Sequence, residues 1–373
     1  MVSIFIPYYN DKKYLSESIE SVLNSTYHNF ELFLLNHAST DGSYDIAHKY
    51  NDNRIKYLDL PINYGAGGGI LLDKFLQQAR GKYVKFFCAD DKLTETGLLQ
   101  LVSYMEENNE VDFAFGDLSY INSDSILTGE TWSNDRKEFS FTFDEIDYIR
   151  QYCNGISSLP WVGSIVKKEC LSKISINKTF VMLFDMSIWL SLLCNGCKIG
   201  FVDKTVALYR IHEGQVSSPQ SKDKILIYSY FEHKLFWKYF LSISDVELVK
   251  KIWPNSQFNK SLFDKQDIPF VVAYNLFVNR KFSEQSVQYL MDSLNSNYKY
   301  YETKLGYGVK ELREDIISFI PKKRNVQIKK ISEKTPKELS FNDLIYLIFR
   351  KIFHTIKSIY RKKDSKKKSQ ATM

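Results

Sequence analysis

The first ninety residues alternate between short apolar runs and amphipathic stretches, and this alternation restricts the fold more than any other feature. Apolar runs typical of buried strands occupy residues 2–6, 31–35, 54–58 and 83–88. Helical spacing of apolar residues is found at 11–23, from about Tyr44, and at 70–79. Because strands that alternate with helices form parallel sheets covered on both faces, the pattern predicts an α/β fold with a mostly parallel sheet.

Polar residues gather where these strands end. Pro7 predicts the end of the first strand, and residues 36–43 form a polar loop after the second. The fourth strand runs into Asp90 and Asp91. Ligands of open α/β sheets bind at the carboxyl ends of strands, and carboxylates are the ligands that Mg²⁺ and Mn²⁺ prefer. The sequence therefore predicts a site here, with an ordinary surface turn as the alternative for the two carboxylates.

A glycine-rich loop, residues 63–69, precedes the third predicted helix. Backbone N–H groups of such a loop can approach a phosphate closely at a helix N-terminus. The spacing matches neither the dinucleotide fingerprint nor the P-loop. A plain flexible turn is the alternative.

Composition and charge narrow the class of protein. The chain has 373 residues and 44% apolar residues, enough for about two globular domains. Nine Lys or Arg against Asp364 give residues 350–368 a local charge of +8, so the rest of a chain of net charge +6 carries −2. A nearly neutral body argues against nucleic acid as the substrate.

Two features could be mistaken for targeting or metal-binding signals. Five cysteines show neither a disulfide framework nor a second pair to complete Cys194-x-x-Cys197, so we expect buried thiols. We expect no secretory signal before the first strand. Residues 180–197 are mostly apolar, but they contain Asp185, and a charge is costly within a membrane span. A buried helix is the better interpretation.

Seven motifs, taken in order, resemble family 2 glycosyltransferases of the GT-A fold, over roughly residues 1–217. They are Pro7-x-Tyr9-Asn10, Ser39-Thr40-Asp41-Gly42-Ser43, Asn63-x-Gly65, Gly81-x-Tyr83, Asp90-Asp91, Phe184-Asp185-x-x-x-Trp189-Leu190 and Leu208-Tyr209-Arg210-Ile211-His212-x-Gly214-x-Val216-Ser217. The resemblance implies an inverting enzyme that moves a sugar from a nucleoside-diphosphate donor, with a UDP-sugar expected, to a hydroxyl of a glycan or lipid-linked acceptor. Such enzymes build bacterial surface polysaccharides.

The resemblance also implies roles for individual residues. Asp91 and Asp90 would hold Mn²⁺ or Mg²⁺, and Asp185 would be the catalytic base, with a simple N-cap as its alternative. Whether helix position lowers its pKa or desolvation raises it stays open. Trp161 would line the acceptor side or pack in the core. The residues expected to contact the nucleotide-sugar are Pro7, Tyr9, Asn36, Asn63, Gly65, Asp90, Asp91 and His212.

Departures from the family pattern keep two alternatives open. Asn36 and His37 stand where two acidic residues usually open the loop, and Cys88 replaces the first Asp of the metal motif. One alternative is a sugar-nucleotide-binding or scaffold protein of impaired activity. The other is a nucleotidyltransferase, an enzyme that would require a basic loop to bind phosphate.

The C-terminal part has a different character. We expect a catalytic domain at 1–217, a helical accessory region at 218–330 with helices at 225–240 and 270–280, and a tail at 331–373. Ser340-x-x-Asp343 resembles a capping box that opens a basic amphipathic helix. Such a helix suits an anionic membrane surface, so the protein is expected to be cytoplasmic and peripheral on the inner face of the cell membrane. A helix packed on the body is the alternative.

Overall fold

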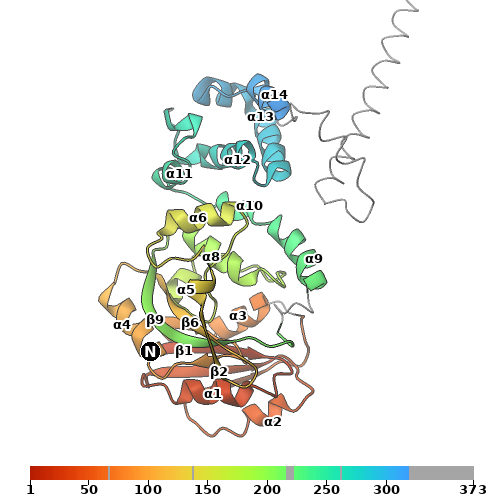
Figure 1. Cartoon of the computed structure of the whole chain (residues 1–373). Helices are drawn as coiled ribbons and strands as arrows, with labels where there is room; N and C mark the ends of the chain where they lie inside the picture. The colour runs from red at the N-terminus through yellow and green to blue at the C-terminus, as the bar shows by residue number, and fades with distance from the viewer. Residues whose placement is uncertain (66–67, 137, 216–221, 261–262, 319–373) are drawn as a thin grey trace, which may run out of the picture. The chain divides into compact units, whose positions relative to one another are not determined.

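The structure, a computed structural model, describes residues 1–65, 68–136, 138–215, 222–260 and 263–318 (Figure 1). Residues 1–308 form one compact unit, and a second begins at residue 309. The domain boundaries expected after residues 217 and 330 stay predictions. The amphipathic tail expected at 331–373 lies outside the described residues.

A nine-stranded sheet forms the centre of the first unit. Its order is β3-β2-β1-β4-β8-β6-β9-β5, with β7 paired to β6. The strands are β1 (Val2–Tyr8), β2 (Phe30–Asn36), β3 (Ile55–Asp59), β4 (Tyr83–Phe86), β5 (Lys92–Leu93), β6 (Phe113–Ile121), β7 (Leu127–Thr131), β8 (Ser164–Lys167) and β9 (Ile199–Arg210).

The half of the sheet formed by β3, β2, β1 and β4 is entirely parallel. In the other half β6 and β9 are parallel, and β5, β7 and β8 pair antiparallel to their neighbours. The expected α/β class is confirmed. The parallel half brings the carboxyl ends of four strands to one edge, where the polar loops follow.

Helices cover both faces of the parallel half, with α1 and α2 on one side and α3 and α8 on the other (Figure 1). Helices α9, α10 and α12 occur where the sequence predicts helices in the region after residue 217. The helices are α1 (Leu15–Leu23), α2 (Ser43–Ala47), α3 (Gly68–Leu76), α4 (Gly97–Glu107), α5 (Trp132–Asp135), α6 (Glu145–Cys153), α7 (Lys168–Leu171), α8 (Phe184–Cys194), α9 (Lys222–His233), α10 (Trp237–Phe240), α11 (Val246–Ile252), α12 (Ile268–Val278), α13 (Ser283–Leu305) and α14 (Val309–Ser318).

The prediction that Pro7 ends the first strand is wrong, because β1 continues through Pro7 to Tyr8. Proline lacks an N–H and is normally excluded from interior strands. Here the pairing of β1 with β4 ends at Phe5, two residues earlier, while Pro7 stays in register with Leu35 of β2. Pro7 therefore lies where β1 no longer needs a donor toward β4.

Helix α8 is buried on all sides. Every residue from Phe184 to Cys194 is buried except Asp185. Trp189 of α8 packs edge-on against Phe86 of β4 and Phe115 of β6. The expected buried helix is confirmed. Among the helices that the structure describes, none combines the length and the apolar character needed to cross a bilayer.

Candidate active site

Hydrogen bonds join the loops that follow β1 and β2. The Asn10 N–H donates to Ser39 Oγ at 3.1 Å, and the Thr40 N–H donates back to Asn10 Oδ1 at 2.8 Å. The Lys12 N–H donates to Asp41 Oδ2 at 3.0 Å. Two motifs that are about thirty residues apart in the sequence therefore form one structural unit at the edge of the sheet.

Three aromatic rings gather beside this unit. His37 is buried, and its Nε2 accepts a hydrogen bond from the Tyr64 N–H at 2.7 Å. Burial lowers the pKa of His37, which favours the neutral ring that such an acceptor requires. The ring lies parallel to that of Tyr64 and edge-on to that of Tyr9, and both tyrosines are exposed. The arrangement presents two aromatic faces to a ligand.

Asn36 shapes the loop after β2. It is buried, and its Oδ1 accepts the Ser39 N–H at 3.0 Å. Its backbone carbonyl accepts the N–H of Leu60 at 3.0 Å, which ties the end of β3 to the end of β2. Asn36 and Pro7 thus lie at the expected strand edge, and their contact with a nucleotide stays a prediction.

Asn63 and Gly65 form a tight turn before α3. Asn63 Oδ1 accepts the Gly65 N–H at 2.7 Å, and Gly65 has φ of +82°, which glycine adopts at little cost. A Cβ at Gly69 would lie 2.2 Å from the Asn177 carbonyl oxygen, and one at Gly68 would lie 2.6 Å from the Phe184 ring. The glycines therefore let the start of α3 touch the segment that leads into α8.

Asp90 and Asp91 follow β4, and both carboxylates have a ligand atom within 4.8 Å of the Cys88 thiol. Asp91 is buried, and its Oδ1 accepts the Arg210 N–H at 2.8 Å. Burial and the neighbouring Asp90 raise the pKa of Asp91 well above its usual range. Burial likewise raises the pKa of the Cys88 thiol.

The two carboxylates fit a divalent cation. Asp91 Oδ2 is buried and has no hydrogen-bond partner among the residues that the structure describes. An unpaired buried oxygen beside a second carboxylate is costly without a compensating positive charge. Hard divalent ions take such oxygen ligands.

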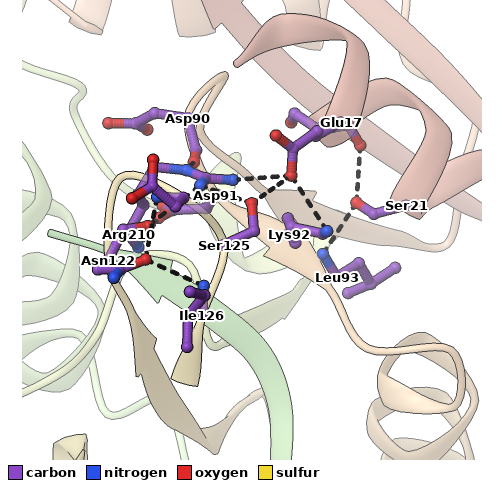
Figure 2. Close-up of polar contacts among 12 residues, drawn as sticks. Glu17, Ser21, Asp90, Asp91, Lys92, Leu93, Asn122, Ser125, Ile126 and Arg210 are labelled. Carbon is purple, nitrogen blue, oxygen red and sulfur yellow. Dashed lines mark hydrogen bonds and ion pairs between the residues drawn. The ribbon is translucent and has the colours of Figure 1, made fainter. Parts of the chain in front are cut away.

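Arg210 holds this pair in place, and sequence reasoning assigned it no role beyond proximity to His212. Its side chain is fully buried, and Nε donates to the Asp90 carbonyl at 2.7 Å (Figure 2). Its Nη1 donates to Ser125 Oγ at 2.8 Å, and its Nη2 lies 3.2 Å from Glu17 Oε2. The guanidinium also stacks over the Tyr14 ring at 4.3 Å. One cation therefore joins β9, α1, the loop after β6 and the acidic pair.

One carboxylate oxygen of Glu17 accepts hydrogen bonds from several donors. Its Oε2 accepts from Ser125 Oγ at 2.5 Å and from Lys92 Nζ at 3.1 Å, as Figure 2 shows. Partial burial acts to raise the pKa of Glu17, but the bonds from Ser125 and Lys92 and the charge of Arg210 outweigh it and lower that pKa. Glu17 is therefore the anion that balances the buried guanidinium.

His212 and Asp11 complete this side of the site. His212 Nε2 lies 3.0 Å from Asp90 Oδ2, and the imidazole packs on Tyr14 at 4.8 Å. Asp11, which the sequence did not single out, accepts the Tyr9 N–H at 2.8 Å. Burial, aided by the charge of Asp90, raises the pKa of Asp11 to about 6. The structure therefore places His212 beside Asp90 and adds a third carboxyl group, and the contact of His212 with the diphosphate or metal stays a prediction.

Asp185 lies in the first turn of α8, but it is not the N-cap. The N-cap is Leu183, which makes no side-chain capping bond, and Asp185 Oδ1 accepts the adjacent Met186 N–H at 2.7 Å. Desolvation raises the pKa of Asp185 to about 6, against two backbone hydrogen bonds that lower it. The balance that the sequence left open is therefore decided by burial, and the capping alternative is not observed.

Glu232 of α9 clamps the segment before Asp185. Its carboxylate accepts the N–H groups of Val181 at 2.6 Å, of Met182 at 3.0 Å and of Leu183 at 2.7 Å. These donors immediately precede α8, where helix N–H groups lack partners of their own. The charge of Glu232 also contributes to the raised pKa of Asp185.

Trp161 links the two halves of the site. It is half-buried and stacks on Phe86 of β4 with ring centroids 4.0 Å apart, and it meets Phe184 of α8 edge-on at 5.7 Å. These packing contacts are the core role that the sequence allowed. A contact with the acceptor stays a prediction.

Comparisons with known proteins agree with this geometry. Residues 3–165 match the model of Glycosyl transferase family 2. The chain is 30% identical over 227 residues to the UDP-Glc:alpha-D-GlcNAc-diphosphoundecaprenol beta-1,3-glucosyltransferase WfaP of Escherichia coli, a match that covers 60% of this chain and 83% of that relative. It is equally similar, at 30% over 227 residues, to WfgD of Escherichia coli, whose name states the same activity and of which the match covers 82%.

The fold is also found among solved structures. The crystal structure of S. aureus TarS 1–349 in complex with UDP-GlcNAc superposes with a TM-score of 0.54 at 18% identity, covering 85% of this chain and 91% of that one. At that identity the likeness supports the fold alone. Together, the family match, the curated relatives and the fold show that this chain is an enzyme that belongs to the family 2 glycosyltransferases, with the GT-A fold and of the bacterial polysaccharide type.

Proposed function

We propose that the chain transfers a sugar, with inversion, from a UDP-sugar to a hydroxyl of a lipid-linked glycan in surface polysaccharide biosynthesis. The observation that carries this proposal is Asp185, the one charged residue of a buried helix and the only residue of that helix that is partly exposed, whose pKa of about 6 suits a general base. A base of this pKa is ionised at neutral pH and still accepts a proton readily.

The acidic pair would serve the donor. Asp91, with Asp90 beside it, would hold Mn²⁺ or Mg²⁺, which when bound stabilises negative charge on a leaving diphosphate. His212, within 3.0 Å of Asp90, would donate to a phosphate oxygen. Tyr9 and Tyr64 would present their exposed rings to the nucleobase. The names of WfaP and WfgD support a uridine nucleotide.

Asp185 would serve the acceptor. An acceptor hydroxyl attacks the anomeric carbon as Asp185 Oδ takes its proton, and the diphosphate leaves from the opposite face, which inverts the configuration. Trp161, packed between Phe86 and Phe184, would offer a flat apolar surface to the acceptor sugar. The acceptors printed in the names of WfaP and WfgD support a diphospholipid-linked sugar.

We also propose that the protein works at the cytoplasmic face of the cell membrane. The support is the local charge of +8 over residues 350–368, beside an apolar repeat that begins near Phe341. Near an anionic leaflet each Lys or Arg contributes roughly 1 kcal/mol of attraction.

The experiment that tests the catalytic proposal is a transfer assay with the purified full chain. UDP-, GDP- and dTDP-sugars are compared, with Mn²⁺ or with chelator, on a synthetic sugar–diphospholipid acceptor, and the product linkage is read by NMR. A linkage of inverted configuration that forms only with a UDP-sugar and metal is the expected result. Donor binding without transfer to any acceptor would instead favour an inactive sugar-nucleotide-binding protein.

A further inference from the structure

Helix α9 exposes its large apolar side chains and buries a charged one. Large apolar side chains project into solvent, with Leu226, Ile227 and Phe231 respectively 58%, 59% and 63% exposed. Tyr228 and Tyr230 are exposed beside them. We call these five residues the α9 face. Soluble proteins seldom expose contiguous apolar patches of this kind without a binding function.

The opposite side of α9 is polar where it meets the body. Glu232 is buried and its carboxylate accepts three backbone N–H groups from residues 181–183. Phe236, in the turn after α9, is also buried and stacks on Phe180 with ring centroids 5.6 Å apart. The carboxylate could not be turned to solvent without leaving those N–H groups unpaired. The orientation of α9 is therefore fixed, and its apolar side must face outward.

The location of the α9 face indicates its partner. Glu232 binds the segment that ends directly at α8, two residues before Asp185, so α9 is attached to the side of the site where the acceptor would be deprotonated. Figure 1 shows α9 at the edge of the first unit. Lys234 Nζ lies over the Tyr230 ring at 4.3 Å, and tyrosine with lysine is the combination found at the interface of a bilayer.

We propose that the α9 face docks into the interfacial layer of a lipid bilayer and so brings Asp185 to the headgroup of a lipid-linked acceptor. This inference rests on the lipid-linked acceptor of the proposed function. The docking of the α9 face is independent of the tail at residues 341–373. It depends on apolar side chains of the first unit, which would be buried in the bilayer. The attachment through Glu232 gives the docked helix a fixed position relative to the catalytic base.

The test measures insertion of the α9 face into lipid vesicles, with the full chain. Phe231→Trp adds a fluorophore on the α9 face to the five tryptophans of the chain, and the difference in emission between this variant and the unmodified chain should shift to the blue on phosphatidylcholine vesicles and be quenched by brominated phosphatidylcholine. The triple variant Leu226→Ser, Ile227→Ser, Phe231→Ser should partition roughly tenfold or more weakly onto the same vesicles. Met291→Ser with Tyr298→Ser, which removes exposed apolar side chains from α13, is the matched control and should bind like the unmodified chain.

Activity separates this inference from the proposed function. The triple variant should lose roughly tenfold in turnover on a vesicle-embedded acceptor, the same factor as its loss of vesicle binding. It should keep its turnover on a soluble acceptor analogue. If brominated lipid quenches Phe231→Trp no more than it quenches the unmodified chain, the docking proposal is wrong, whatever the enzyme transfers. Sedimentation that shows a dimer which the triple variant dissociates would also overturn it, in favour of a second copy. If no acceptor is glycosylated while quenching persists, the catalytic proposal fails and the docking stands.

Discussion

The backbone N–H of Arg210 donates a 2.8 Å hydrogen bond to Oδ1 of Asp91, a residue 119 positions earlier in the chain. The antiparallel pairing of β5 with β9, in which Lys92 lies opposite Leu208, brings the two together. With Oδ1 held in this way, Oδ2 is the carboxylate oxygen left unpaired within the described part of the chain. The strand pairing therefore decides which oxygen is offered to a cation.

Replacing Asp91 with Asn tests the cation site. Asn keeps an oxygen for the Arg210 N–H but removes the charge that a divalent ion requires. We expect the increase in thermal stability that Mn²⁺ and donor give the unmodified chain to be lost. The melting temperature without metal should stay level or rise, since the burial of an unpaired charge is costly. A Mn²⁺-dependent shift that survives in Asp91→Asn would remove this residue from the site.

Replacing Arg210 with Lys tests the network beneath the site. An ammonium keeps the charge but cannot reproduce the forked contacts to Asp90, Ser125 and Glu17. Because the charge is kept and the forked hydrogen bonds are lost, we expect a cost of about 3 kcal/mol, the upper end for a hydrogen bond that involves a charged group. Urea denaturation measures it. Lys92→Met, which removes a half-exposed partner of Glu17, is the control and should cost at most about 1 kcal/mol.

Replacing Asp185 with Asn tests the base. A positioned base contributes roughly 10²–10⁴-fold, so turnover should fall by that factor while donor binding is kept. In the unmodified enzyme, kcat/KM should fall below about pH 6, because a protonated Asp185 cannot accept the hydroxyl proton. Transfer rates that are flat from pH 5 to 8 would contradict the assignment.

The same raised pKa predicts a pH-dependent effect on stability. The pKa of Asp185 rises from 3.8 in the unfolded chain to about 6 in the folded one, so the folded state holds the proton more tightly. The cost of its buried charge is absent below about pH 4 and complete above about pH 6. Asp185→Asn should therefore raise the melting temperature at pH 7 and leave it unchanged at pH 4. Scanning calorimetry at the two pH values makes the comparison.

Replacing Glu232 with Gln tests whether the charge of Glu232 or only its side-chain oxygen matters to Asp185. The negative charge of Glu232 helps to raise the pKa of Asp185, so its removal should move the acid limb of kcat/KM to lower pH. Stability should fall by about 2 kcal/mol, because the carboxylate accepts charge-assisted bonds from residues 181–183. Glu284→Gln, an exposed glutamate of α13, is the control. An acid limb that does not move would restrict Glu232 to a structural role.

Removal of residues 341–373 tests the tail. The full chain should bind anionic liposomes less as salt rises, since the Debye length is about 8 Å at physiological ionic strength. The truncated chain should be released from them and keep its activity on a soluble acceptor. Unfolding of the truncated chain, with no binding of liposomes by the full chain, would show that this segment belongs to the core.

Local patterns in the sequence were enough to predict the parallel half of the sheet and the edge where the loops meet. Each strand there is a short apolar run, and each motif follows its strand directly, so neighbours in the chain become neighbours in space. Pro7 was misjudged because the extent of β4 decides whether an N–H is needed there. No local signal reports that extent.

The network around Arg210 could not be predicted for a related reason. Glu17, Ser125 and Arg210 meet only through the register of β5 on β9 and the position of the loop after β6. The one signal was the position of Arg210 within a motif ascribed to His212. The pKa of Asp185 was open because two opposing effects of similar size depend on burial, which the sequence does not give.

The fully buried guanidinium of Arg210 also sets the order in which this enzyme can mature on the ribosome. Its hydrogen bonds reach residues 17, 90, 122 and 125, so a nascent chain that ends before β9 has all four of these residues but lacks the guanidinium that joins them. The four parallel strands can pair as soon as β4 emerges, whereas contacts across more than a hundred residues form late. Cation binding should therefore appear only in nascent chains that extend past residue 210.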